Sequence, residues 1–330
     1  MFKTKDIAVV ILNWNGKTLL EKFIPSILKY SDDAVIYVAD NASTDDSVAF
    51  VTERFPTVQV IENSENSGYA KGYNEALKHV DEPLFCLLNS DIEVTENWLQ
   101  PIISEFNSDA NTAIIQPKIL DYKNKSYFEY AGAAGGYIDK FGYPFCRGRI
   151  FDTIEKDSGQ YNDTKTIFWA SGACLFIKNS VFKNLGEFDE TYFAHMEEID
   201  LCWRAFNSNY TTKYVGSSTV YHVGGATLSN TNPRKTYLNF RNSLFTLIKN
   251  TDTNIIFKIG FRMVLDGVAA LRFLYQLRPA FLVAILKAHL SFYCNLPRLI
   301  KQRKEIPKRS GYYETNSIVW AYFAKNRKTL

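Results

Sequence analysis

The stretch FCLLNSDIEV, residues 85–94, decides the fold. Its first four residues form an apolar run of the kind found in buried strands, and the run ends abruptly at Asn89-Ser90-Asp91, with Glu93 two residues on. A strand that crosses a core and finishes in carboxylates places them at an edge of its sheet. We predict that these carboxylates face a cleft, where their oxygens hold a hard divalent cation that carries a diphosphate.

The chain around this stretch alternates strand and helix signals. Apolar runs that end in polar residues predict strands over 8–15, 34–43, the first part of 58–77, and 84–91. Helical periodicity or helix-start residues predict helices over 17–30, 44–55, the last part of 58–77, and 98–106. This βαβα order predicts an α/β fold, with a parallel sheet that is covered by helices on both faces.

Polar residues follow each of these predicted strands, namely Asn13, Asp40, Asn41, the loop 63–68 and the stretch 89–91. The carboxyl ends of parallel strands meet at one edge of a sheet, and ligands of such sheets bind outside that edge. We therefore expect these residues to gather around one ligand site.

The second half of the chain is less regular. Residues 113–161 mix glycines with Tyr and Phe, which predicts a meander or loop over the cleft. Residues 166–182 predict a strand, a bend at Gly172, a second strand and a helix start. Residues 188–206 end in a predicted helix, and 212–225 contain a predicted strand that ends at His222.

Composition indicates a soluble globular protein in a reducing compartment. Hydrophobic residues are 46% and charged residues 22% of the chain, as in ordinary globular proteins. The five cysteines are widely spaced and include no CxxC pair, which argues against a disulfide framework and a zinc knuckle. The N-terminus lacks the features of a signal peptide, and we predict a cytoplasmic location.

The C-terminal region is basic, aromatic and apolar. Residues 256–330 contain 14 Lys/Arg and 3 Asp/Glu, a net charge of +11, whereas the rest of the chain carries −8. Charged residues interrupt every apolar run in 255–309 before it reaches the roughly 18 residues of a spanning helix. This pattern predicts amphipathic helices that lie on an anionic membrane or, alternatively, a helical pair packed on the main domain. No nucleic-acid-binding motif is present, and we expect no nucleic-acid partner.

Several motifs together resemble family-two glycosyltransferases of the GT-A fold, in the rhamnosyltransferase-like branch. They are VVILNWNG, VADNASTDDS, NSENSGYAKGYNEAL, LLNSDIEV, WASGACLFIKNSVFKNLGEFDETYFAHMEEIDLCWR and YHVGGA, and they span roughly residues 7–245 in the family order. The resemblance implies a mixed, mainly parallel sheet. It also implies a catalytic domain over 1–250, with a nucleotide-binding half at 1–112, an acceptor half at 113–250 and a helical tail at 251–330.

The resemblance places the nucleotide beside Asp40 and the segment 66–74. Residues expected near the nucleotide or its diphosphate are Asn13, Asp40, Asn41, Asn66, Gly68, Asn74, Asn89 and Arg241. Taken alone, Asp40 and Asn41 also suit an Asx turn that leads into the next helix.

Asn89-Ser90-Asp91 stands where the family has its DxD-like motif. The resemblance implies that Asp91 and His222 bind Mg²⁺ or Mn²⁺, and Glu93 is a weaker candidate that would act through water. Because the first acid of the motif is Asn89 here, metal affinity should depend on bound diphosphate. The alternatives are a strand-end cap for Asp91 and an ordinary satisfied polar residue for His222.

The family usually reads Glu-Asp-x-Asp where this chain has Glu197-Glu198-Ile199-Asp200. Glu198 takes the position of the family's catalytic base, and Glu197 remains a second candidate. A base at this place removes the proton of the acceptor hydroxyl. Asp200 is expected to orient Arg204 or to cap a turn. Taken alone, any one of the three acids also suits a solvated helix start that the helix dipole stabilises.

The resemblance thus implies an inverting, metal-dependent transfer of a sugar from a nucleotide-diphosphate donor to a glycan or lipid-linked acceptor. The transfer would belong to cell-surface polysaccharide biosynthesis and take place at the inner face of the membrane. Two other classes stay open. A nucleotidyltransferase would need a Gly-rich basic loop after the first strand, which NWNGKTLLEK fits poorly. A non-catalytic carbohydrate-binding protein would bind nucleotide-sugar without turnover.

Overall fold

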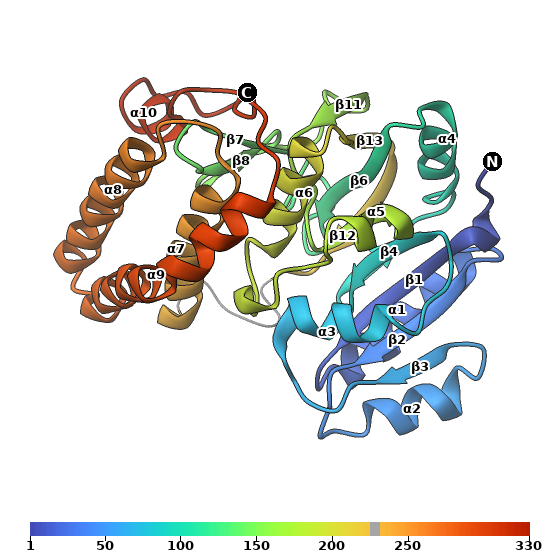
Figure 1. Cartoon of the computed structure of the whole chain (residues 1–330). Coiled ribbons are helices and arrows are strands. Elements are labelled where there is room, and N and C mark those ends of the chain that lie inside the picture. Colours follow the sequence, from blue (N-terminus) through green and yellow to red (C-terminus); the bar gives the residue numbers. More distant parts are fainter. Residues whose placement is uncertain (225–231) are drawn as a thin grey trace.

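The computed structural model describes residues 1–224 and 232–330, which form one central sheet with helices on both faces and a helical C-terminal part (Figure 1). The sheet has the strand order β11-β13-β6-β12-β4-β1-β2-β3, with β5 paired to β13. Its strands are β1 Ile7–Asn13, β2 Val35–Asp40, β3 Gln59–Glu62, β4 Leu84–Asn89, β5 Ile92–Val94, β6 Thr112–Asp121, β11 Thr164–Ile167, β12 Cys174–Lys178 and β13 Thr211–His222. The helices that follow them are α1 Lys17–Tyr30, α2 Ser47–Arg54, α3 Gly68–Leu77, α4 Gln100–Ser108, α5 Asn179–Asn184 and α6 Glu197–Asn207, with short 3₁₀ turns at Thr4–Asp6 and Glu190–Tyr192.

The predicted parallel arrangement is confirmed. Strands β3, β2, β1 and β4 are parallel neighbours, while β12 runs antiparallel between β4 and β6. Alternate side chains of β1 enter two different cores. Ala8 and Val10 pack with α3 and α6, whereas Val9 and Ile11 pack with α1 and α4. A strand buried on both faces must be apolar throughout, which is why the apolar runs predicted these strands correctly.

The prediction of a meander or loop from residue 113 onward is wrong for its first part. Residues Thr112–Asp121 form β6, a ten-residue strand in the middle of the sheet. The sequence did not predict this strand because the polar residues Gln116 and Lys118 interrupt its apolar run. Both are buried and satisfied: Gln116 donates to the carbonyl oxygen of Gly132 at 3.1 Å, and Lys118 pairs with Asp157 at 2.9 Å.

The remainder of that segment is a small antiparallel sheet, ordered β10-β9-β8-β7. Its strands are β7 Gly136–Ile138, β8 Pro144–Cys146, β9 Arg149–Ile150 and β10 Thr153–Ile154. Trp169 is 3% exposed and donates from Nε1 to the carbonyl oxygen of Tyr137 at 2.8 Å. It is a core residue that joins the small sheet to the main one.

The C-terminal part consists of α7 Pro233–Asn250, α8 Ile255–Tyr275, α9 Pro279–Glu305 and α10 Ile318–Phe323. Helices α8 and α9 lie at the end of the molecule remote from β3 (Figure 1), with α9 packed along α7. The segment after α9 returns to the small sheet, where the amide of Glu314 donates to the carbonyl oxygen of Ile138 at 3.0 Å. Among the described helices, α9 is long and apolar enough by length and composition to cross a membrane, and 28% of its most apolar window is buried.

Candidate active site

The ends of β1 and β2 form the first part of the site. Asn13 and Asp40 are paired in the strand register, and Asn13 Nδ2 donates to Asp40 Oδ1 at 2.9 Å. Asp40 also accepts from the amide of Ser43 at 2.8 Å and from the Ser43 hydroxyl at 2.6 Å, which is the Asx-type turn. Asn13 Oδ1 is buried without a hydrogen-bond partner among the described residues. The folded chain therefore leaves one buried acceptor unsatisfied at the carboxyl ends of these strands.

Asn41 and Asn66 build the neighbouring loop. Asn41 Nδ2 donates to Asn66 Oδ1 at 3.1 Å and to the carbonyl oxygen of Gly68 at 3.0 Å. Gly68 has φ +85°, and a Cβ there would lie 2.4 Å from the carbonyl oxygen of Phe193. Only glycine permits both this conformation and this approach. The start of α3 is thereby held against the segment that precedes α6.

Asn74 does not face this site. It is 2% exposed, its Nδ2 donates to the carbonyl oxygen of Phe188 at 2.9 Å, and its Oδ1 accepts from the amide of Phe188 at 3.1 Å. Both ends of the amide are engaged by the backbone, so the expected nucleotide contact is replaced by a structural role.

Asp91 and His222 come together, as predicted, although they lie 131 positions apart in the sequence. His222 Nε2 is 3.1 Å from Asp91 Oδ1 and 3.5 Å from Asn89 Nδ2. His222 ends β13, which pairs with β5 directly after Asp91. On the other side of the ring, Nδ1 is 3.3 Å from Oε2 of Glu129. Although burial favours the neutral ring, the carboxylates of Asp91 and Glu129 raise the pKa of His222 to about 10.

These residues fit a divalent cation that displaces the proton of His222, because imidazole ligates a metal as the neutral ring. Carboxylate oxygen, amide oxygen and imidazole nitrogen are ligands that Mn²⁺ and Mg²⁺ accept. The described residues contain no group of three or more His, Cys, Asp and Glu side chains arranged to hold a metal by themselves. An ion here would need ligand oxygens to complete its shell. Glu93 is turned elsewhere, because it pairs with Lys125.

Glu197 and Glu198 begin α6 with carboxylates that no described side chain hydrogen-bonds. In each of them Oε2 is buried and lacks a partner. Burial, followed by the charge of Glu198, holds the pKa of Glu197 well above its usual range. Burial raises the pKa of Glu198 to about 7, against the opposing effect of backbone amides at the helix start. Of this pair, Glu197 holds its proton more tightly, and Glu198 is the carboxyl group that ionises first as the pH rises.

Asp200, the third acid of this run, is structural as expected. Its Oδ2 accepts from Arg204 Nε at 2.9 Å, and its Oδ1 accepts from Asn250 Nδ2 at 2.7 Å. Lys249 lies 3.0 Å away. These contacts anchor α6 to α7 and orient the two glutamates.

The segment before Glu197 is conformationally strained. Phe193, His195 and Met196 all have positive φ, at 64°, 71° and 74°. Asn242 Nδ2 holds this segment through the carbonyl oxygens of Tyr192, Ala194 and His195, at 2.7–3.1 Å. Strain of this kind persists only where surrounding contacts over-determine the backbone, and it clusters at functional sites.

Arg241 belongs to the same clamp and not to a phosphate site. Its Nη2 donates to the carbonyl oxygens of Thr191 and Tyr192, at 2.9 and 3.1 Å, and its Nε donates to Asn242 Oδ1 at 2.8 Å. Nη1 is 3.4 Å from the Tyr237 hydroxyl. Every guanidinium nitrogen is engaged internally, so the expected phosphate contact is replaced by support of the segment before α6.

Glu129 is the residue that sequence reasoning missed. It lies in the irregular stretch after β6, where nothing marks it as a partner of His222. Its role depends on a residue that is distant in sequence, so no local signal was available.

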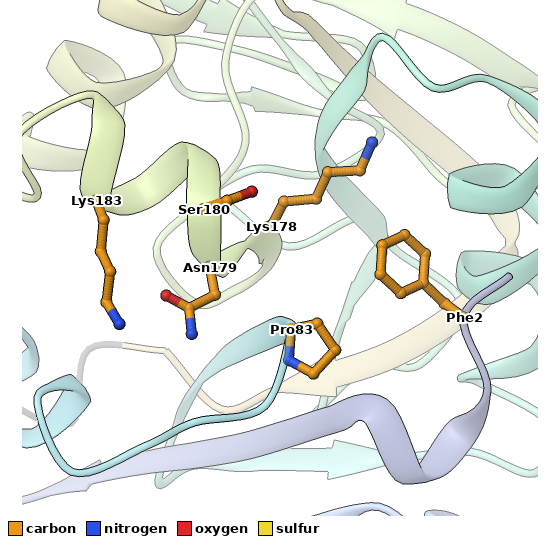
Figure 2. A pocket seen from close by; sticks show the side chains of 6 residues that line it. All are labelled: Phe2, Pro83, Lys178, Asn179, Ser180 and Lys183. Carbon is orange, nitrogen blue, oxygen red and sulfur yellow. The ribbon is translucent and has the colours of Figure 1, made fainter.

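A separate pocket of about 430 Å³ lies at the other end of the strands, near the amino end of β4. It is lined by Phe2, Pro83, Lys178, Asn179, Ser180 and Lys183 (Figure 2). Pro83 precedes β4, and Lys178 pairs with Leu84 at the amino end of that strand. Asp91 follows the carboxyl end of β4. The pocket is therefore distinct from the candidate site.

Solved structures identify the fold. The match to GalNAc-T7 with UDP, GalNAc and Mn²⁺ has a TM-score of 0.59 at 17% identity and covers 74% of this chain and 48% of that one. A mannosyltransferase of Pyrobaculum calidifontis, in complex with GDP-Man and Mn²⁺, matches with a TM-score of 0.55 at 11% identity over 87% of both chains. The fold is thus the GT-A fold of glycosyltransferases.

The chain belongs to glycosyl transferase family 2, whose sequence profile matches residues 8–186. It is 24% identical over 234 residues to an N-acetylglucosaminyl-diphospho-decaprenol L-rhamnosyltransferase of Mycobacterium tuberculosis, covering 66% of this chain and 76% of the relative. A low-salt glycan biosynthesis hexosyltransferase, Agl10 of Haloferax volcanii, is 25% identical over 211 residues, which is 62% of each chain. The protein is a glycosyltransferase of glycan biosynthesis that uses a nucleotide-sugar donor.

Proposed function

We propose that this enzyme inverts the anomeric centre of its donor sugar in a single displacement, with Glu198 as the base. The observation that carries this proposal is the pair of buried carboxyl groups at the start of α6, each with an Oε2 atom that has no hydrogen-bond partner among the described residues. Glu198 removes the acceptor hydroxyl proton, the acceptor oxygen forms a bond to the anomeric carbon, and the bond to the nucleoside diphosphate breaks with its electron pair. Glu197, protonated, is proposed to donate a hydrogen bond in the same site.

Asp91 and His222 would hold a divalent cation, and Glu129 would fix the orientation of the His222 ring. When bound, the cation neutralises charge on the leaving diphosphate. Asn13 and Asp40 are proposed to contact the base or ribose of the donor, and the loop built by Asn41 and Asn66 is proposed to close beside them. A carboxylate on the second nitrogen of a metal-ligating histidine is a common supporting contact.

The test is a screen of UDP-, dTDP- and GDP-sugars with the purified protein and Mn²⁺ or Mg²⁺. We expect metal-dependent release of nucleoside diphosphate from one donor, and a thermal shift with that donor even where no acceptor is present. Absence of any thermal shift with all donors would contradict the proposed donor site.

A lipid-linked acceptor is proposed because the M. tuberculosis relative is named for one. The C-terminal helices support the same conclusion through an unusual distribution of residues. The buried residues of α8 are Lys258, Arg262, Asp266 and Ala270, whereas eight of its large apolar residues are exposed. They are Ile256, Phe257, Phe261, Val264, Val268, Leu271, Leu274 and Tyr275, and α9 adds Val283, Leu286, Leu290 and Tyr293.

A helix that is polar inside and apolar outside needs an apolar surrounding. The net charge of +11 in 256–330 favours the surface of an anionic membrane over a second copy of the same basic region. We therefore propose that residues 251–330 attach the catalytic domain, 1–250, peripherally to the cytoplasmic face of the membrane.

The double variant Val268→Glu/Leu271→Glu is expected to lower vesicle binding at least about tenfold, because each side chain buries apolar area in the lipid. Flotation with phosphatidylcholine vesicles, with and without phosphatidylglycerol, measures the effect. Tyr127→Glu, which changes an exposed aromatic outside these helices, is the control. A concentration-dependent dimer that the double variant dissociates, without vesicle binding by the parent, would assign the surface to a second copy.

A further inference from the structure

One buried cation of the described structure is unlike the others. Seven Lys and Arg residues are buried, and six of them pair with carboxylates: Lys118 with Asp157, Arg147 with Asp163, Arg204 with Asp200, Lys249 with Asp189 and Asp200, Lys258 with Asp252, and Arg262 with Asp266. The seventh is Arg149, which is 9% exposed and forms no ion pair with any described residue. A buried guanidinium without an anion is costly, so its presence calls for an anion from outside the chain.

Contacts hold the Arg149 guanidinium in place and leave its Nη1 without a hydrogen-bond partner among the described residues. Its Nε donates to the carbonyl oxygen of Tyr130 at 2.9 Å, its Nη2 lies 3.6 Å from Cys146 Sγ, and its guanidinium stacks 4.4 Å from the Tyr130 ring centre. Nη1 donates to no atom of the described residues, yet it is not sealed from solvent, in contrast to Nη2 of Arg147. A fixed guanidinium with a free, accessible donor is the usual form of a phosphate-binding arginine.

The location of Arg149 connects it to the catalytic groups. It pairs across the β8–β9 turn with Cys146, whose thiol lies within the electrostatic influence of Arg149, Glu129 and Glu198. Tyr130 follows Glu129, the residue that contacts His222. Cys146, the strand partner of Arg149, therefore lies within electrostatic reach of Glu198, the proposed base, whereas the donor diphosphate has its own proposed cation at Asp91 and His222.

We propose that Arg149, covered by Tyr130, binds a phosphoryl group of the acceptor, so that the enzyme prefers acceptors whose sugar is linked through diphosphate to a lipid. This assignment rests on the proposed function and specifies which group of the acceptor, its phosphoryl group, the same active site recognises. The donor diphosphate offers the same chemistry, and the experiment separates the two sources.

The experiment compares Arg149→Met with Arg147→Met, a matched control that removes a paired arginine from the same turn. The acceptors are N-acetylglucosamine linked through diphosphate to a farnesyl chain and the neutral octyl glycoside of the same sugar. We expect Arg149→Met to raise KM for the diphosphate acceptor at least about tenfold, to change KM for the neutral one less than about twofold, and to leave donor affinity unchanged. Because a costly buried charge is removed, the Tm of Arg149→Met should stay equal or rise, whereas Arg147→Met should lower it.

A second measurement does not depend on acceptor identity. Calorimetry follows inorganic pyrophosphate binding to protein saturated with the donor nucleoside diphosphate and Mn²⁺. Tighter binding to wild type than to Arg149→Met, by at least about tenfold, supports the subsite. Equal pyrophosphate affinity in the two proteins, or a parallel loss of donor affinity in Arg149→Met, overturns it. A wild-type protein that binds no donor nucleotide would instead contradict the proposed function.

Discussion

Glu198→Gln is expected to lower turnover about 10³-fold, because the amide cannot accept the acceptor proton at the displacement step. Donor binding should remain, since the carboxylate lies at the start of α6 and not among the residues at the ends of β1 and β2. Transfer assays that measure kcat together with donor thermal shift separate these effects. The pH profile should agree: kcat/KM of the wild type falls as pH drops through about 7, because protonation of Glu198 removes the base.

Glu197→Gln is the matched control for this prediction. Because the pKa of Glu197 is held well above its usual range, it is already protonated, and glutamine reproduces its neutral, hydrogen-bonding form. We expect a loss of less than about tenfold and an unchanged pH midpoint, on the scale of a single hydrogen bond. If Glu197→Gln were the more damaging of the two substitutions, the roles of the glutamates would be reversed.

Asp91→Asn is expected to lower turnover by about 10²- to 10³-fold and to raise the Mn²⁺ concentration needed for half-maximal activity. The substitution removes the one carboxylate that follows β4 into the site and leaves His222 with Glu129 alone, so charge on the leaving diphosphate is less well neutralised. Metal titrations of transfer, and of the thermal shift given by the donor nucleotide, measure the effect.

Glu93→Gln serves as the control, since this acid lies two residues from Asp91 and pairs with Lys125 outside the site. Its activity and metal dependence should match those of the parent. An Asp91→Asn protein with unchanged metal dependence would show that the cation, if one is needed, is held elsewhere.

Much of the fold followed from local patterns. Strands buried on both faces must be apolar throughout, so β1, β2 and β4 were visible as runs that end in polar residues. Since parallel strands share a carboxyl edge, the gathering of Asn13, Asp40 and Asp91 could also be expected. The motif around Glu197 and Glu198 placed the glutamates at a helix start, where the structure has them.

Other features depended on partners far away in the sequence. Strand β6 was hidden because its buried Gln116 and Lys118 are satisfied by residues 132 and 157. Arg241 has the residue type of a phosphate ligand, but the carbonyl oxygens of Thr191 and Tyr192 occupy it.

The sequence by itself determined which segments are buried, where they end and which chemical groups stand at those ends, because periodicity and turn chemistry are local properties. Only the tertiary structure decided which groups are left free. Hydrogen bonds and ion pairs from distant residues engage Asn74, Asp200 and Arg241, while Glu198 and Arg149 keep unpaired atoms. A polar side chain is available to a ligand only when the folded chain has not already satisfied it, and that depends on long-range packing.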